Sequence, residues 1–103
     1  MKLKLDIIVD LMGYTSTNRL EMFKNRIAKK QIIWMGYCNT TGLKNMDFII
    51  SDPNLIRPNE EKFYSEKVIY LPKIWNSHCG FDLERNENPP PFLKNKYFTF
   101  VTG

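Results

Sequence analysis

Residues 32–47 read Ile-Ile-Trp-Met-Gly-Tyr-Cys-Asn-Thr-Thr-Gly-Leu-Lys-Asn-Met-Asp, and this stretch decides the fold. An apolar run breaks into a loop rich in glycine and hydroxyl groups, and a second apolar run, residues 48–50, follows at once. In an α/β protein such a loop lies at the carboxyl end of a strand, where ligands bind. A second loop of the same character, residues 12–19, follows the first apolar run of the chain. The two loops together predict one site built from successive strand ends.

The apolar runs predict a parallel sheet. Each run is short, apolar and rich in β-branched or aromatic residues, which is typical of a buried parallel strand. The expected strands are residues 5–11, 31–35, 48–51, 68–71 and 97–101. The sequence therefore predicts an α/β fold in which the connections between strands lie on the sheet.

Two helices are expected in these connections. The first begins at Thr17 or Asn18, either of which can cap it, and its residues 20, 23 and 27 face the sheet. The second begins at Pro58, which is followed by acidic residues, and ends at residue 65 or 66. Residues 73–95 are polar, contain three consecutive prolines and show no period, so an irregular loop is expected there. The whole chain, residues 1–103, is read as one unit.

Composition restricts the class of protein. The chain has 103 residues, 43% of them hydrophobic, which suits one small globular domain. Its net charge of +4 is spread out, and the one basic cluster, residues 24–30, reads as a solvated helix face rather than a nucleic-acid patch. Cys38 and Cys79 are expected to be reduced thiols. No signal peptide or apolar run of about 18 residues is present, so a cytoplasmic protein is expected.

Most motifs of known chemistry are missing. His78 is the only histidine and neighbours Cys79, but no zinc-type spacing or orienting partner accompanies it, so neither a metal nor a Cys/His nucleophile is predicted. The loop at residues 36–42 lacks the Gly-Lys-Ser/Thr ending of a phosphate-binding loop. Its Asn and Thr groups suit sugar hydroxyls or a peptide backbone, although an ordinary turn would look the same. Arg19 is either an anion or peptide ligand or a plain surface residue.

The two loops together resemble the protein O-linked N-acetylglucosamine transferases, including their Spindly-like bacterial and plant relatives. The matching segments are Asp-Leu-Met-Gly-Tyr-Thr at residues 10–15, Asn-Arg at 18–19, Gln-Ile-Ile-Trp-Met-Gly-Tyr at 31–37, Thr-Thr-Gly at 40–42, Met-Asp-Phe-Ile-Ile-Ser-Asp at 46–52 and Tyr-Ser-Glu-Lys at 64–67. The chain departs from the family at Cys38, where proline is usual, and at Asn39, where glycine is usual.

The resemblance implies a Rossmann-like parallel sheet that forms part of the first lobe of a two-lobed (GT-B type) glycosyltransferase. By match, Met35, Gly36, Tyr37 and Cys38 would bind the sugar. Tyr14, Thr15 and Arg19 would bind the acceptor.

The implied reaction moves N-acetylglucosamine from UDP-N-acetylglucosamine to Ser or Thr hydroxyls of proteins, without a metal or organic cofactor. Proximity of sugar and hydroxyl supplies much of the rate of such a transfer.

The same resemblance implies that this chain is incomplete as an enzyme. The family's catalytic histidine is expected upstream of residue 1, and the groups that hold the nucleotide diphosphate are expected downstream of residue 103, in a second lobe. No catalytic residue is therefore assigned within the chain, which is expected to be inactive alone. The alternative is a free-standing, non-catalytic module that binds a peptide or a sugar in the same cleft.

Overall fold

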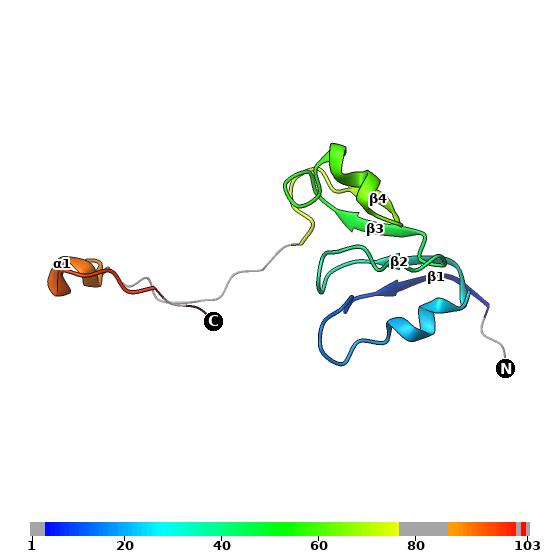
Figure 1. Cartoon of the computed structure of the whole chain (residues 1–103), viewed down its shortest axis with the longest axis horizontal. Coiled ribbons are helices and arrows are strands. Elements are labelled where there is room, and N and C mark those ends of the chain that lie inside the picture. Colours follow the sequence, from blue (N-terminus) through cyan, green and yellow to red (C-terminus); the bar gives the residue numbers. More distant parts are fainter. Residues whose placement is uncertain (1–3, 77–86, 101, 103) are drawn as a thin grey trace.

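Four parallel strands form one sheet in the computed structural model, which describes residues 4–76, 87–100 and 102 (Figure 1). The strands are β1 (Leu5–Asp10), β2 (Ala28–Ile33), β3 (Phe48–Ser51) and β4 (Lys67–Tyr70). They lie side by side in chain order, β1-β2-β3-β4, and every neighbouring pair is parallel. The predicted Rossmann-like parallel sheet is confirmed for this part of the chain.

The two expected helices are short 3-10 helices, η1 (Leu20–Lys24) and η2 (Pro58–Phe63). Two of the three expected inward residues, Leu20 and Phe23, are buried in η1, whereas Ile27 lies beyond the end of the helix and is partly buried against the core. The spacing of three residues between Leu20 and Phe23 suits a 3-10 helix as well as an α-helix. The backbone becomes extended at Asn25, three residues before β2 begins. A longer helix has no room there.

The second strand begins earlier than the sequence predicts. The prediction was wrong because Lys29 and Lys30 read as a polar helix exit, whereas both lie within β2. Lys29 forms an ion pair with Asp6 of β1, with 2.6 Å between Nζ and Oδ1. Lys30 places its Nζ 5.4 Å from the centre of the Phe48 ring. Charged side chains are tolerated in this strand because both of them reach solvent.

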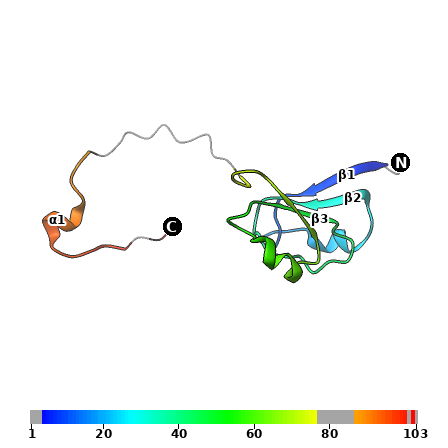
Figure 2. The ribbon, with the colours of Figure 1, turned by 90° about the horizontal axis from the view of Figure 1, so that it is seen from above.

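The core lies on one face of the sheet. Leu20 and Phe23 come from the β1–β2 connection, Met46 from the β2–β3 connection and Ile56 from the β3–β4 connection, and all pack with strand residues such as Ile49. Three successive right-handed crossovers that step in one direction must lie on the same side of the sheet. Figure 2 shows the 3-10 helices and loops below the strands and no connection above them. The opposite face is therefore left without cover.

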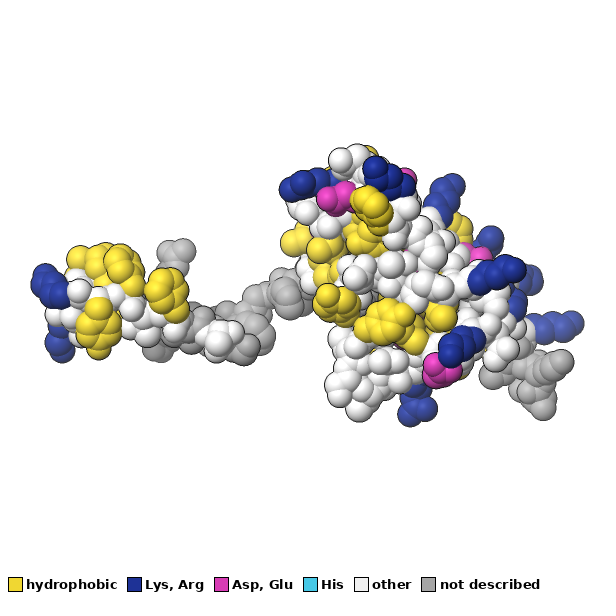
Figure 3. All heavy atoms as spheres, in the orientation of Figure 1, with side chains coloured by type: hydrophobic (Ala, Val, Ile, Leu, Met, Phe, Trp, Pro, Cys, Tyr) yellow, Lys and Arg dark blue, Asp and Glu magenta, His cyan; other side chains and the backbone are white. Residues whose placement is uncertain are grey.

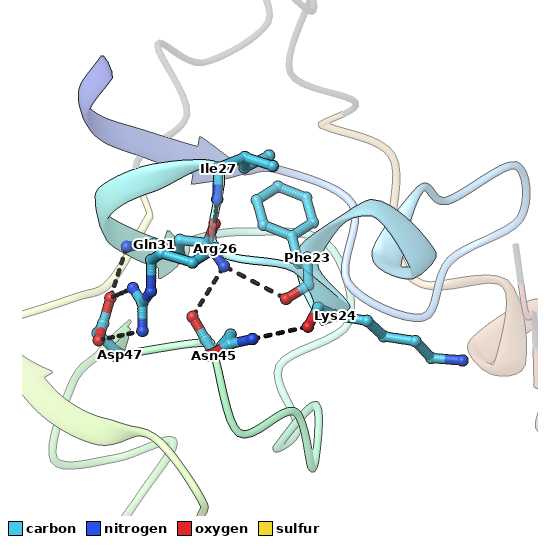
Figure 4. Close-up of polar contacts among 7 residues, drawn as sticks. All are labelled: Phe23, Lys24, Arg26, Ile27, Gln31, Asn45 and Asp47. Atoms are coloured by element: carbon cyan, nitrogen blue, oxygen red, sulfur yellow. Dashed lines mark hydrogen bonds and ion pairs between the residues drawn. The ribbon is translucent and has the colours of Figure 1, made fainter. Parts of the chain in front are cut away.

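A fully buried glutamine joins the first two connections at the amino edge of the sheet (Figure 4). Gln31 Oε1 accepts a hydrogen bond from the Ile27 N–H at 2.9 Å. Its Nε2 donates to the carbonyl oxygens of Asn45 at 2.8 Å and Phe23 at 3.3 Å. Beside it, the Asp47 carboxylate accepts a hydrogen bond from the Gln31 N–H at 2.8 Å and forms an ion pair with the guanidinium of Arg26. Buried amides are stable only when paired in this way.

The expected fifth strand is absent from the described part of residues 97–101. Residues 97–100 form no strand, and Val101 lies outside the described residues. A strand needs a partner for its N–H and C=O groups, and Phe98 instead stacks on Phe92 with ring centres 4.9 Å apart. Within the expected irregular loop, α1 (Pro91–Asn95) forms one helical turn, which lies apart from the sheet in both ribbon views (Figures 1 and 2). Residues 77–86, including His78 and Cys79, lie outside the described residues.

Candidate functional site

The two loops predicted to share a site interlock through their backbones at the carboxyl end of the sheet. Gly13 and Gly36 both adopt positive φ, +54° and +68°, a conformation that glycine accepts without strain. A Cβ on Gly36 would come within 2.9 Å of Met12 Cα, and a Cβ on Gly13 within 2.8 Å of the Tyr37 carbonyl oxygen. The Tyr37 N–H donates to the Met12 carbonyl oxygen at 3.4 Å. Two glycines therefore allow an approach that any side chain would block.

A buried carboxylate shapes the first loop. Asp10 ends β1 on the covered side, and its Oδ2 accepts from the Gly13 N–H at 2.8 Å. Its Oδ1 receives the Met12 N–H at 3.4 Å. The carbonyl oxygen of Asp10 accepts from the Trp34 N–H at 2.9 Å, which continues the pairing of β1 and β2 into the loops. The strand end thus sets the positions of both loops.

A second buried carboxylate holds the far end of the β2–β3 loop. Glu66, just before β4, accepts hydrogen bonds from the Thr41 N–H at 2.8 Å, from the Thr41 hydroxyl, and from the Thr40 hydroxyl at 2.8 Å. The Ser65 N–H donates to Thr40 Oγ1 at 3.1 Å. The Tyr14 hydroxyl donates to the Thr41 carbonyl oxygen at 2.5 Å, which links the first loop to this network. The loop is fixed at both ends.

The structure brings the residues predicted to bind the sugar together on the second loop. Met35 and Tyr37 are exposed, and Met35 has a φ of +72°, which is uncommon for a residue with a side chain. Cys38 is half-buried, and its Sγ lies 3.8 Å from the Gly36 carbonyl oxygen. The exposed side chains and the glycine backbone offer apolar contact and close backbone approach to a ligand. Their role in sugar binding stays a prediction.

Two of the three residues predicted to bind the acceptor lie in the interlocked region. Tyr14 reaches the second loop through its hydroxyl, and Thr15 Oγ1 donates to the Met12 carbonyl oxygen at 2.7 Å. Arg19 is exposed at the N-cap of η1, and among residues 4–76 no hydrogen bond or ion pair holds its guanidinium. Among residues 4–76, Arg19 therefore has no side-chain hydrogen bond or ion pair with the other predicted residues, and acceptor binding stays a prediction for all three.

The electrostatic environment keeps the Cys38 thiol protonated. Burial raises the pKa of Cys38 to about 11, and the negative charge of Asp52 adds to this effect. A nucleophilic cysteine needs a lowered pKa, near positive charge. Cys38 is therefore suited to lining a surface and not to attacking a substrate.

The loop after β3 is held by a third buried carboxylate. Burial alone would raise the pKa of Asp52, but hydrogen bonds from the N–H groups of Trp75, Asn54 and Leu55 lower it overall. A shallow pocket of about 250 Å³ lies here, lined by Asp52, Asn54, Leu55, Lys73, Ile74 and Trp75. The Trp34 indole N–H donates to the Trp75 carbonyl oxygen at 2.8 Å, so this pocket adjoins the second loop.

No group of three or more His, Cys, Asp or Glu side chains with metal-binding geometry occurs within residues 4–76, 87–100 and 102. No helix in that part of the chain is long and apolar enough to cross a membrane. The residues that shape the loops are instead the isolated carboxylates Asp10, Asp52 and Glu66.

Sequence reasoning missed these carboxylates as parts of the site. Asp10 carried a usable signal, because an aspartate three residues before a glycine often accepts backbone N–H groups in a turn. Glu66 carried no such signal, since its partners Thr40 and Thr41 lie more than twenty residues earlier in the chain. In the sequence, Glu66 lies where the second expected helix ends and within the matching segment at residues 64–67.

Comparisons with known proteins identify the family that the chain is similar to. The family model described as "Glycosyl transferase family 41" matches residues 2–79. The chain is 34% identical over 97 residues to a protein of Petunia hybrida named "Probable UDP-N-acetylglucosamine--peptide N-acetylglucosaminyltransferase SPINDLY", which covers 94% of this chain and 10% of the relative. It is 35% identical over 78 residues to the SEC protein of Arabidopsis thaliana, which bears the same enzyme name, and this match covers 76% of the chain and 8% of the relative.

A solved structure shows the same fold. A mutant O-GlcNAc transferase of Thermobaculum terrenum superposes with a TM-score of 0.64 at 34% sequence identity, covering 68% of this chain and 14% of that one. The chain spans about a tenth of the length of the first curated relatives it matches.

Proposed function

This chain belongs to glycosyl transferase family 41, and from that premise we propose that it forms part of the first lobe of a protein O-glycosyltransferase. The complete enzyme would transfer N-acetylglucosamine from UDP-N-acetylglucosamine to Ser or Thr hydroxyls of proteins. The names of its relatives support the donor and the peptide acceptor. Since the chain spans about a tenth of those relatives, the activity is proposed for the complete protein and not for these 103 residues.

The observation that carries this proposal is the interlocking of the two glycine loops at the carboxyl end of the sheet. Ligands of open α/β sheets bind at that end. Gly13 and Gly36 bring the loops into backbone contact, so residues 14 and 35–38 are held at one edge. Such rigidity is what a transferase needs, because a sugar and a hydroxyl react quickly only when their relative positions are fixed.

Each loop would serve one substrate. The exposed side chains of Met35 and Tyr37 would contact the N-acetyl group and the sugar ring, while the backbone at Gly36 would allow close approach. Tyr14 and Thr15 would face the acceptor peptide from the first loop. Cys38, kept protonated, would line the sugar side without taking part in the chemistry.

The diphosphate of the donor requires a second lobe in this proposal. Departure of a nucleoside diphosphate develops negative charge, which cationic groups or N–H donors must stabilise in the transition state. The proposed sugar and acceptor loops, residues 12–19 and 34–42, contain a single cationic side chain, that of Arg19. We therefore propose that the chain alone is inactive, and that no metal or organic cofactor is involved.

A chimeric enzyme tests the proposal. The segment of the Thermobaculum terrenum enzyme that aligns with residues 5–76 is replaced by residues 5–76 of this chain, and the transfer of sugar to an acceptor peptide is measured. Transfer is expected to persist, and Gly36→Ala is expected to reduce it about a hundredfold, since a misplacement near 1 Å has that effect. Gly42→Ala is the matched control, because its φ is +67° yet a Cβ there meets nothing within 4 Å.

The alternative of a non-catalytic binding module predicts a different result. A chimera that folds but does not transfer would overturn the transferase proposal. Binding of N-acetylglucosamine or peptide by the 103-residue chain, together with that inactive chimera, would favour the module. Turnover of UDP-N-acetylglucosamine by the chain alone would refute the proposed need for a second lobe.

A further inference from the structure

Tyr14, which the proposed function assigns to the acceptor side, is anchored through its hydroxyl to the second loop. The hydroxyl donates to the Thr41 carbonyl oxygen at 2.5 Å, although the residue is 55% exposed. The backbone contact of Gly13 with the second loop fixes where this side chain starts. It does not fix where the ring ends, because two side-chain bonds can still rotate. The position of the Tyr14 hydroxyl therefore depends on the position of Thr41.

Thr41 is held in turn by the buried carboxylate of Glu66. One oxygen, Oε1, accepts hydrogen bonds from the Thr41 N–H at 2.8 Å and from the Thr41 hydroxyl. The hydroxyl oxygen of Thr41 also accepts from the Leu43 N–H at 3.1 Å, so the backbone and the side chain of Thr41 are both fixed. Thr41 and Glu66 are each 3% exposed, which keeps water away from these bonds. Glu66 therefore fixes the residue whose carbonyl oxygen receives the Tyr14 hydroxyl.

The sheet fixes the position of Glu66 itself, which immediately precedes β4. On one side of it, the Lys67 N–H donates to the Asp47 carbonyl oxygen at 3.0 Å. On the other side, the Ser65 N–H donates to Thr40 Oγ1 at 3.1 Å. Because the backbone is hydrogen-bonded on both sides, the carboxylate has little freedom to follow the loop. The loop instead takes its position from the carboxylate.

The charge of Glu66 is unfavourable to bury for loop stability alone. Within residues 4–76, no lysine or arginine forms an ion pair with this carboxylate. Removing a charge from water without a cation is costly, and hydrogen bonds offset only part of the cost. Buried polar groups of this kind specify one geometry in some proteins. Glu66 is therefore a candidate for defining a position in the site and not only for stabilising the loop.

Recognition at the carboxyl end of the sheet relies on single polar groups more than on charge. On the face drawn in Figure 3, Lys and Arg side chains gather at the amino end of the strands, and the carboxyl end shows mostly uncharged side chains. An uncharged hydroxyl or N–H group discriminates between ligands only when it is held in place. The position of the Tyr14 hydroxyl is therefore expected to matter for the acceptor.

We propose that Glu66 is a positioning residue for the acceptor: through Thr41 it sets the place of the Tyr14 hydroxyl. This inference rests on the proposed function, which assigns Tyr14 to the acceptor side. Since Glu66 is buried, it acts without touching the substrate. The Tyr14 hydroxyl gives its proton to the Thr41 carbonyl oxygen, so its own oxygen is available as an acceptor. That oxygen suits a backbone N–H of the acceptor peptide.

A double-mutant cycle in the 103-residue chain tests this positioning without any need for transfer. In urea unfolding, Tyr14→Phe is expected to raise the ratio of unfolded to folded chain about fivefold, the size of one neutral hydrogen bond. In a Glu66→Gln background, an N–H donor replaces an acceptor oxygen and faces other donors. Tyr14→Phe is expected to raise the ratio less than twofold there, because its hydrogen bond is already disturbed.

Asp52→Asn is the matched control for Glu66→Gln. Asp52 is also a buried carboxylate that accepts three N–H groups, but those groups belong to Trp75, Asn54 and Leu55. Tyr14→Phe should keep its fivefold effect in the Asp52→Asn background. If Glu66→Gln does not fold, Thr41→Val replaces it in the cycle, since it removes one donor to Glu66 and keeps the side-chain shape.

The chimeric enzyme described above tests the consequence for the acceptor. Glu66→Gln and Tyr14→Phe are each expected to raise the KM of the acceptor peptide about fivefold and to leave the KM of UDP-N-acetylglucosamine within about twofold. A loss of folded enzyme alone would lower the maximal rate and change neither KM. The difference between the two KM values therefore separates positioning from stability.

Two results would overturn the proposal. One is an equal effect of Tyr14→Phe on unfolding in the native and Glu66→Gln backgrounds, and the other is an equal rise of both KM values in the chimera. An inactive chimera without substitutions would overturn the proposed function instead. The urea cycle would then still decide whether Glu66 positions Tyr14.

Discussion

Replacement of Gly36 by alanine is expected to separate the two loops of the site. A Cβ at this position would lie 2.9 Å from Met12 Cα and closer still to the carbonyl group of that residue. Met12 would have to retreat by more than 0.5 Å, the difference between 2.9 Å and the 3.4 Å at which ordinary contact begins. Because the clash is with backbone, no rotation of a side chain relieves it. The loop after β1 must move as a whole.

The cost of this change has two parts. A residue with a Cβ in the left-handed region costs about 1–2 kcal/mol. Loss of the hydrogen bond from the Tyr37 N–H to the Met12 carbonyl oxygen adds about 0.5–1.5 kcal/mol. Gly36→Ala is therefore expected to reduce the free energy of unfolding by about 2–3 kcal/mol. Gly42→Ala has only the cost of the left-handed backbone, since its φ is +67° and its Cβ would meet no atom within 4 Å.

Urea unfolding distinguishes the two variants. Trp34 lies in the second loop, and its indole donates to the Trp75 carbonyl oxygen, so tryptophan fluorescence reports on this region. With a denaturant dependence of about 1–3 kcal/mol per molar urea, the midpoint for Gly36→Ala should fall by about 1 M or more relative to the native chain. The urea midpoint of Gly42→Ala should lie between those of Gly36→Ala and the native chain. Equal midpoints for Gly36→Ala and Gly42→Ala would refute the interlocking of the loops.

Three further outcomes follow from the buried polar groups. Gln31→Leu leaves one N–H and two carbonyl groups without partners, so unfolding should be easier by about 3 kcal/mol or more in a thermal or urea melt. The lowered pKa of Asp52 means that its stabilisation is present above pH 3.8 and is lost as the pH falls through the folded-state value. The stability difference between the native chain and Asp52→Asn, measured in urea, should therefore shrink as the pH falls below 3.8. With Cys79→Ser as background, Cys38 should react with iodoacetamide at pH 8 about tenfold more slowly than a thiol of pKa 9.0. Its pKa of about 11 lowers the thiolate fraction about a hundredfold, and the higher nucleophilicity of that thiolate offsets about tenfold of this loss.

The sheet could be predicted because its strands are apolar runs separated by loops with distinct composition. The third strand was predicted with the bounds that the structure shows, Phe48–Ser51. The start of the second strand was missed because Lys29 and Lys30 read as a polar helix exit, although both lie in β2 with side chains that reach solvent. Such residues contradict the usual rule that parallel strands are apolar on both faces.

The glycines of the site could be predicted and the carboxylates could not, and the reason lies in the range of their interactions. Gly13 and Gly36 are recognised locally, since a glycine directly after an apolar run ends a strand whatever it contacts later. Glu66 acts through Thr40 and Thr41, from which β3 and η2 separate it along the chain. A carboxylate with no local partner reads as a surface residue, because most glutamates are exposed. Its burial here is affordable only because three donors converge on it, and that convergence is a property of the folded sheet. The positions of the loops therefore depend on the sheet order, which the glycines alone do not specify.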